Sequence, residues 1–168
     1  AAQVISQDGT ESMIITETLD ANDVYTYTFK ADGTQDISAT IAWTDPAANP
    51  LPGGNEDVAT PSLVNDLDLR ISQDGGVTFL PWVLDVATPT AGATNGDNVV
   101  DNVEKIEINT PEAGDYIVRV SHKGQLLVND SQVFSLVLEG ISSEGFMVST
   151  TNANVLTCPE LQTATFNI

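Results

Sequence analysis

Strand-like segments constrain the fold of this chain more than any other feature. Seven segments have the composition or the period-two alternation of a strand with one buried face. In one of them, Tyr25, Tyr27 and Phe29 fall on the same face. The segments are 13–19, 24–30, 37–44, 68–73, 103–109, 115–122 and 132–140. Turn-forming clusters separate them, and no convincing amphipathic helix is present, so the sequence predicts an all-β sandwich or barrel.

Length and apolar content indicate one domain of ordinary size. The 168 residues are 41% hydrophobic, which is enough for a real core. We predict a β domain over 1–140, followed by a linker and the start of a second, truncated β module over 141–168. Strand-like segments at 146–150 and 163–168 indicate a hairpin in that tail. Because two strands cannot bury a core alone, the hairpin either packs on the first domain or frays.

The charge balance is strongly acidic. The chain has 24 acidic and 5 basic residues, for a net charge of −19. Such a chain does not suit nucleic acid or anionic membranes, which need clustered Lys and Arg. Two compatible interpretations remain: solubility in a secreted or salt-exposed protein, and calcium binding by some of the acids.

Cysteine usage and hydropathy add little about location. Cys158 is the one cysteine, so no internal disulfide forms and the redox compartment stays open. No apolar run approaches the length of a membrane span. The chain opens Ala-Ala-Gln-Val-Ile without the basic segment of a signal peptide, and we interpret it as a piece of a longer protein.

Catalytic chemistry is not indicated. Nucleophilic catalysis needs a nucleophile, a base and an orienting acid in contact, and His122 is the one histidine of the chain. It precedes Lys123-Gly124 at the end of a predicted strand, where a structural or exposed histidine is typical. No Gly-x-Ser-x-Gly motif is present. A zinc cluster is also excluded, because it needs several His and Cys residues.

Calcium is the metal that this composition suits, because it takes carboxylate and carbonyl oxygens. Asp66 and Asp68 stand at i, i+2 in an apolar run, so on a strand they share one face, opposite Leu67 and Leu69. No EF-hand spacing is present, so a site would be assembled from separate strand ends and loops. The predicted ligands are Asp45, Asp66, Asp68, Asp101, Asn102 and Glu104. The alternative is that these side chains cap turns and face water.

Aromatic side chains raise one further alternative. Trp43, Trp82, Tyr25 and Tyr27 would suit a sugar-stacking surface, since aromatic faces pack on carbohydrates. Strand periodicity instead places Trp43 among the core-facing positions, which favours the core.

Five blocks in order carry a resemblance to a known family. They are Ile41-Ala-Trp-Thr-Asp-Pro46, Ser62-Leu-Val-Asn-Asp-Leu-Asp-Leu69, Asp101-Asn-Val-Glu-Lys105, Pro111-x-x-Gly-x-Tyr-x-Val-x-Val120 and Gln132-x-Phe-Ser-Leu-Val-Leu138. From about Thr10 to Gly140 the chain resembles the β-barrel or jelly-roll domain that follows the catalytic domain in a branch of secreted subtilisin-like serine proteases (peptidase family S8). That domain is akin to the P domain of proprotein convertases. The tail resembles the opening of an immunoglobulin-like module.

The resemblance implies an eight-stranded jelly roll, secretion, calcium in some members, and packing against a preceding subtilase domain in the same polypeptide. It implies no catalysis here, because the family's triad lies in that preceding domain. Two functions follow as hypotheses. The first is a non-catalytic accessory domain that stabilises the protease and modulates substrate access. The second is a calcium-dependent module that binds carbohydrate or insoluble protein.

Overall fold

The computed structural model describes residues 5, 8–9, 11–48, 61–73, 77–88, 90–126 and 130–142. The regular elements of these ranges are all strands. They are β1 (Ser12–Asp20), β2 (Tyr25–Ala31), β3 (Ile37–Trp43), β4 (Asp66–Gln73), β5 (Thr78–Phe79), β6 (Trp82–Val83), β7 (Thr94–Asn95), β8 (Val103–Ile108), β9 (Gly114–Lys123) and β10 (Ser131–Glu139). The hairpin predicted at 146–150 and 163–168, together with Cys158, lies outside the described residues.

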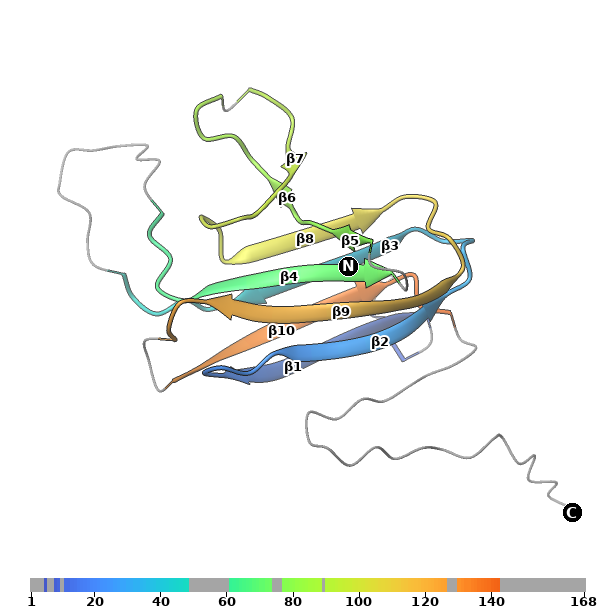
Figure 1. Cartoon of the computed structure of the whole chain (residues 1–168), viewed down its shortest axis with the longest axis horizontal. Coiled ribbons are helices and arrows are strands. Elements are labelled where there is room, and N and C mark those ends of the chain that lie inside the picture. Colours follow the sequence, from blue (N-terminus) through green and yellow to red (C-terminus); the bar gives the residue numbers. More distant parts are fainter. Residues whose placement is uncertain are drawn as a thin grey trace, which may run out of the picture.

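Two four-stranded antiparallel sheets form a sandwich (Figure 1). One sheet has the order β1-β10-β3-β8 and the other β2-β9-β4-β5, while β6 and β7 form a separate pair. The strands β1 to β4 alternate between the two sheets. Later in the chain, β9 pairs with β2 and β10 pairs with β1. This is the double Greek-key order of a jelly roll. The all-β class and the eight-stranded jelly roll are therefore confirmed.

The seven long strands correspond to the seven predicted segments, with boundaries that differ by a residue or two. Three further strands, β5, β6 and β7, were not predicted. Each has only two residues, which is too short to show any periodicity. The strand β7 lies within the long connection between β6 and β8, and it pairs with β6.

The core lies between the two sheets and follows the alternation. On β4, Leu67, Leu69 and Ile71 are fully buried, while the intervening side chains point away from the other sheet. Trp43, Tyr25 and Tyr27 are also buried. The predicted core position of Trp43 is thus confirmed, and because Tyr25 and Tyr27 are buried as well, the faces of these three rings are not available to stack on a sugar.

Gly140 ends β10 in a conformation that other residues avoid. Its φ is +83°, and an added Cβ would lie 2.5 Å from the carbonyl oxygen of Asp36. The N–H groups of Gly140 and Ile141 both donate to the carbonyl oxygen of Glu11, at 3.1 Å each. The glycine thus lets the chain turn where β10 meets the residues that precede β1.

Candidate functional site

Strand pairing brings the acidic motif together with a lysine. Asp66, Asp68 and Arg70 alternate with buried residues along β4 and therefore share its outer face. The antiparallel register of β4 with β9 sets Asp66 opposite Lys123. The predicted placement of Asp66 and Asp68 on one face of a strand is confirmed. The register adds a cation, Lys123, that the local sequence does not show.

Lys123 makes the central contacts of this group. Its Nζ lies 2.9 Å from Asp68 Oδ1, 2.9 Å from Asp97 Oδ1 and 3.5 Å from Asp66 Oδ2. Asp97 comes from the connection between β7 and β8, so one ammonium group joins two segments that are distant in sequence. Its side chain is 33% exposed, which leaves the ammonium only partly screened by water.

Arg70 supplies the second cation. Its Nη2 donates to Asp68 Oδ1 at 2.9 Å and also to Asp97 Oδ1. Its Nη1 donates to its neighbour's carbonyl oxygen, that of Leu69, at 2.7 Å and lies 3.8 Å from Glu104 Oε2. Because Arg70 is only 15% exposed, its guanidinium is held within the protein surface by these acceptors.

Glu104 reaches the same place from the other sheet. It lies on β8, is 1% exposed, and accepts the N–H of Leu69 at 2.5 Å. That N–H lies on the edge of β4 beyond its short pairing with β5, which covers only Ile71 and Ser72. The carboxyl group therefore satisfies a backbone donor that no neighbouring strand satisfies, and it joins the edges of the two sheets.

We name these six residues the carboxylate–cation cluster: Asp66, Asp68, Arg70, Asp97, Glu104 and Lys123. Burial raises the pKa of Glu104 to about 8, and the charge of Asp68 acts in the same direction. The N–H of Leu69 and the two cations oppose this rise. Burial also raises the pKa of Asp66, against the effect of Lys123.

The exposed member of the cluster behaves differently. Burial acts to raise the pKa of Asp97, but hydrogen bonds from Lys123 and Arg70 outweigh it and the pKa is lowered. For Lys123, burial acts to lower the pKa, and its hydrogen bonds to Asp97 and Asp68 outweigh that effect, so its pKa is raised. Four carboxyl groups thus share two cations, and the most buried of them, Glu104, is the one that favours its neutral form.

The fit of this cluster to calcium can be judged from its donors. Asp66 Oδ1 and Glu104 Oε1 are buried without a hydrogen-bond partner among the described residues. One oxygen of each of the four carboxyl groups, however, already lies within 4 Å of Lys123 or Arg70, whose charges stand where a metal cation would stand. No group of three or more His, Cys, Asp or Glu residues in the described ranges has the arrangement of a metal site. As arranged, the cluster suits internal ion pairs better than calcium.

The other three predicted ligands make separate contacts. Asp45 accepts the N–H groups of Val64 and Asn65, at 2.7 and 2.8 Å. Asp101 accepts a hydrogen bond from Asn98 at 3.2 Å, and Asn102 Nδ2 donates to the carbonyl oxygen of Trp43 at 2.7 Å. The structure thus brings Asp66, Asp68 and Glu104 together, while Asp45, Asp101 and Asn102 hold loops and strand ends.

Sequence reasoning missed three members of the cluster as partners of the acids. Arg70 continues the i, i+2 pattern of Asp66 and Asp68, and that spacing was a signal that could have identified it. Lys123 and Asp97 gave no such signal, because their approach depends on strand register and on the path of a loop.

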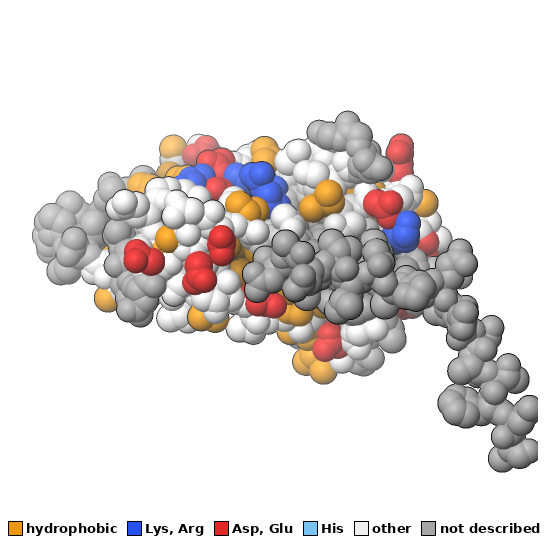
Figure 2. All heavy atoms as spheres, turned by 60° about the horizontal axis from the view of Figure 1, so that its bottom comes forward, with side chains coloured by type: hydrophobic (Ala, Val, Ile, Leu, Met, Phe, Trp, Pro, Cys, Tyr) orange, Lys and Arg blue, Asp and Glu red, His pale blue; other side chains and the backbone are white. Residues whose placement is uncertain are grey.

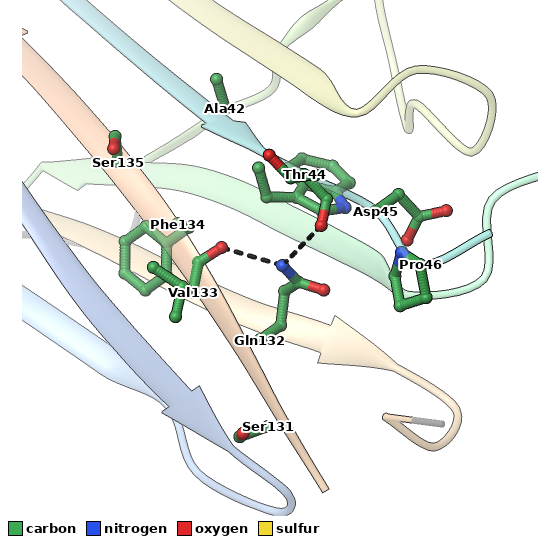
Figure 3. A pocket seen from close by; sticks show the side chains of 10 residues that line it. Ala42, Thr44, Asp45, Pro46, Ser131, Gln132, Val133, Phe134 and Ser135 are labelled. Carbon is green, nitrogen blue, oxygen red and sulfur yellow. Dashed lines mark hydrogen bonds between the residues drawn. The ribbon is translucent and has the colours of Figure 1, made fainter. Parts of the chain in front are cut away.

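A second candidate is a groove of about 680 Å³ on the sheet β1-β10-β3-β8, beside the end of β3 (Figure 3). Gln132 stands in it, with Nε2 donating to the carbonyl oxygens of Thr44 and Val133 at 3.2 and 2.9 Å. Its Oε1 accepts a hydrogen bond from Asn65 at 2.8 Å. The polar atoms of this side chain are therefore held by hydrogen bonds within the protein.

His122 also has a structural contact. Its Nε2 accepts the backbone N–H of Asn22 at 3.1 Å, which ties β9 to the turn after β1. A histidine that accepts a backbone hydrogen bond in this way is not presented to a hydroxyl nucleophile, and the geometry offers no support for a triad at this residue.

The class defined by these features is an acidic jelly-roll sandwich that carries a partly buried carboxylate–cation cluster. The chain is 30% identical over 122 residues to the serine protease/ABC transporter B family protein tagA of Dictyostelium discoideum. That match covers 71% of this chain but only 6% of the relative's length. The chain is therefore a distant relative of a small part of a protein that contains a serine protease. No family model matches it.

Two solved structures resemble the fold. One is PliG of Aeromonas hydrophila, a periplasmic inhibitor of g-type lysozyme, with a TM-score of 0.37 and 14% identity over 78% of this chain and 87% of that one. The other is a protein from Sulfurospirillum deleyianum, with a TM-score of 0.36 and 12% identity over 75% and 96%. At these scores neither likeness supports a statement about function.

No helix within the described ranges is long and apolar enough to span a membrane.

Proposed function

We propose that this chain is a non-catalytic accessory domain of a larger, secreted, subtilisin-like serine protease. The observation that carries the proposal is the similarity of 122 residues to part of a protein named for its serine protease. Two features support it: the five ordered sequence blocks, and a jelly-roll topology of the kind that those blocks imply. The likeness covers a small share of the relative, so the protease activity itself is part of the proposal.

The mechanism that this proposal implies is structural. A rigid sandwich that docks on the native protease, and not on its unfolded chain, shifts the folding equilibrium toward the native state. It can also narrow the approach of large substrates to a neighbouring active site. The sandwich needs no catalytic group of its own for either role.

Deletion in the parent polypeptide tests the proposal. The parent protease is compared with a variant in which this segment is replaced by a flexible linker, so that the neighbouring parts stay connected. We expect a lower yield of folded protease, a lower melting temperature, and faster cleavage of large relative to small substrates. Unchanged yield, stability and substrate range would contradict the accessory role.

A calcium-dependent binding module is the alternative, and the two unpartnered carboxylate oxygens of Asp66 and Glu104 are the observation that favours it. Thermal melts with calcium or chelator decide between the two, with magnesium at equal ionic strength as the control. Calcium at a hundred times its dissociation constant would add about 2.7 kcal/mol to the stability. Because Lys123 and Arg70 occupy the cluster, we expect the two melts to coincide. A rise specific to calcium would favour the alternative, and retention on polysaccharide or collagen would then identify its target.

A further inference from the structure

Among the residues that the structure describes, Arg119 is the basic side chain without an ion-paired or hydrogen-bonded partner. All five Lys and Arg residues lie in the described ranges. Four of them form ion pairs: Lys30 with Asp115, Lys105 with Glu107, and Arg70 and Lys123 within the cluster. Arg119 is exposed on β9 and makes no hydrogen bond or ion pair with any residue that the structure describes. In a chain with a net charge of −19, a guanidinium without a carboxylate needs an explanation.

The register makes this position unfavourable for folding. Arg119 lies directly opposite Arg70 of β4 and, on its other side, opposite Thr26 of β2. Like charges directly opposite each other destabilise an antiparallel pair. The nearby Asp68 is already bound by Arg70 and Lys123, so it does not compensate Arg119. Folding alone therefore gives no reason for an arginine at this position.

On the side away from the carboxylate–cation cluster, the surface beside Arg119 is uncharged. Ile117, two residues earlier on the same face of β9, is 43% exposed. Thr28 and Ser72 flank Ile117 on the two neighbouring strands. Figure 2 shows several Lys and Arg side chains in the upper part of the view, with both acidic and apolar side chains beside them. Arginine is enriched at the centre of protein interfaces, and the exposed aliphatic side chain of Ile117 beside it adds apolar surface that a partner can cover.

We propose that the outer face of the sheet β2-β9-β4, centred on Arg119 and Ile117, docks against a protein surface that presents a carboxylate. The guanidinium binds that carboxylate with two parallel hydrogen bonds, and Ile117 is covered by the surrounding contact. Charge complementarity identifies the partner's chemistry: elsewhere the acidic surface repels a carboxylate, so this position fixes where an acidic group is accepted. Resting on the proposed function, the docked partner is the protease domain of the same polypeptide.

Hydroxyl-radical footprinting of the intact parent protein, compared with the isolated 168-residue chain, tests this surface. We expect Ile117 to be labelled several-fold more slowly in the parent than in the isolated chain. Arg119→Ala in the parent should remove most of this several-fold protection, because a hydrogen-bonded charge at the centre of an interface is lost. Arg119→Lys keeps the charge but not the paired geometry and should fall between the two.

The controls separate docking from folding. Lys105→Ala removes an exposed cation from the other sheet and should leave the protection of Ile117 unchanged. In the isolated chain, Arg119→Ala should not lower the melting temperature, because the side chain has no described partner to lose and its charge lies opposite that of Arg70. Protection of a different face in the parent would overturn the docking surface and leave the accessory role intact. Equal labelling of every face in both proteins would overturn both.

Discussion

Substitution of Arg70 by alanine is expected to lower the free energy of unfolding by about 3 kcal/mol. Removing one partner of a buried ion pair leaves an uncompensated charge, which costs about 3–5 kcal/mol. We take the lower part of that range because Asp97 is half exposed and Lys123 still binds Asp68 at 2.9 Å. Urea denaturation at neutral pH and constant ionic strength measures the change through the midpoint and slope of the transition.

Lys30→Ala is the matched control. Lys30 also holds an aspartate on the outer face of the same sheet, at 2.7 Å from Asp115, but both side chains are about half exposed. Exposed pairs contribute about 0–1 kcal/mol, so this variant should be close to wild type. Asp68→Asn in the Arg70→Ala background should restore part of the loss, since it removes the carboxylate left without its arginine. Equal losses for Arg70→Ala and Lys30→Ala would show that the cluster is no more than a set of surface pairs.

The sandwich could be predicted from the sequence because its strands are long and half buried. Over seven to ten residues, alternation identifies both the strand and the face that meets the core, as in Tyr25, Tyr27 and Phe29. A strand of two residues contains no period, so β5, β6 and β7 were not predicted. Their pairing is decided by the loops that bring them together.

The candidate site could be predicted only in part. The shared face of Asp66 and Asp68 follows from the strand period, and a cation beside them follows from the cost of burying carboxylates. Which cation it is depends on tertiary structure. The register of β4 with β9 supplies Lys123, and the facing edge of the other sheet supplies Glu104, which is 35 residues away from its donor Leu69. The residue pattern along one strand shows neither the pairing with β9 nor the approach of Glu104.

Asp45 and Asn102 illustrate the opposite limit. Both have side-chain oxygens and lie near strand ends, so the sequence alone does not distinguish them from calcium ligands. In the structure Asp45 accepts two backbone N–H groups, and Asn102 donates to a backbone carbonyl. Backbone groups that strands leave unpaired must find partners, and short polar side chains at strand ends are the usual ones. In an acidic chain this use competes with metal binding at every such position.

Stability is expected to fall as the pH rises from about 5 to about 8, because of Glu104. Its pKa is 4.5 ordinarily and about 8 in the folded protein, where burial disfavours its charged form. Between these values the folded protein keeps a proton that the unfolded chain has lost. The stability that this proton contributes is therefore fully present below the ordinary pKa of 4.5 and is lost as the pH rises through the folded-state pKa of about 8. One such proton gives a slope of at most about 1.4 kcal/mol per pH unit.

Other members of the cluster also change the stability with pH, but most of their effect lies outside the neutral range. The raised pKa of Asp66 acts in the same direction as that of Glu104, beginning at lower pH. The lowered pKa of Asp97 gives stability that is lost only in acid, and the raised pKa of Lys123 gives stability that is lost only in alkali. Neither of these last two residues titrates in the neutral window, so a loss of stability there is assigned to Glu104, with a contribution from Asp66 at its acidic end.

Glu104→Gln isolates this contribution. The amide oxygen of glutamine can still accept the N–H of Leu69, so the link between the sheet edges is kept while the titrating proton is removed. Urea denaturation of both proteins at intervals across the window should show a falling stability for wild type and a much flatter profile for the variant. At the alkaline end the variant should be the more stable protein, because it avoids a buried negative charge beside Asp68. Parallel profiles for the two proteins would show that Glu104 is ionised in the folded state throughout, and that Arg70 and Lys123 compensate its burial in full.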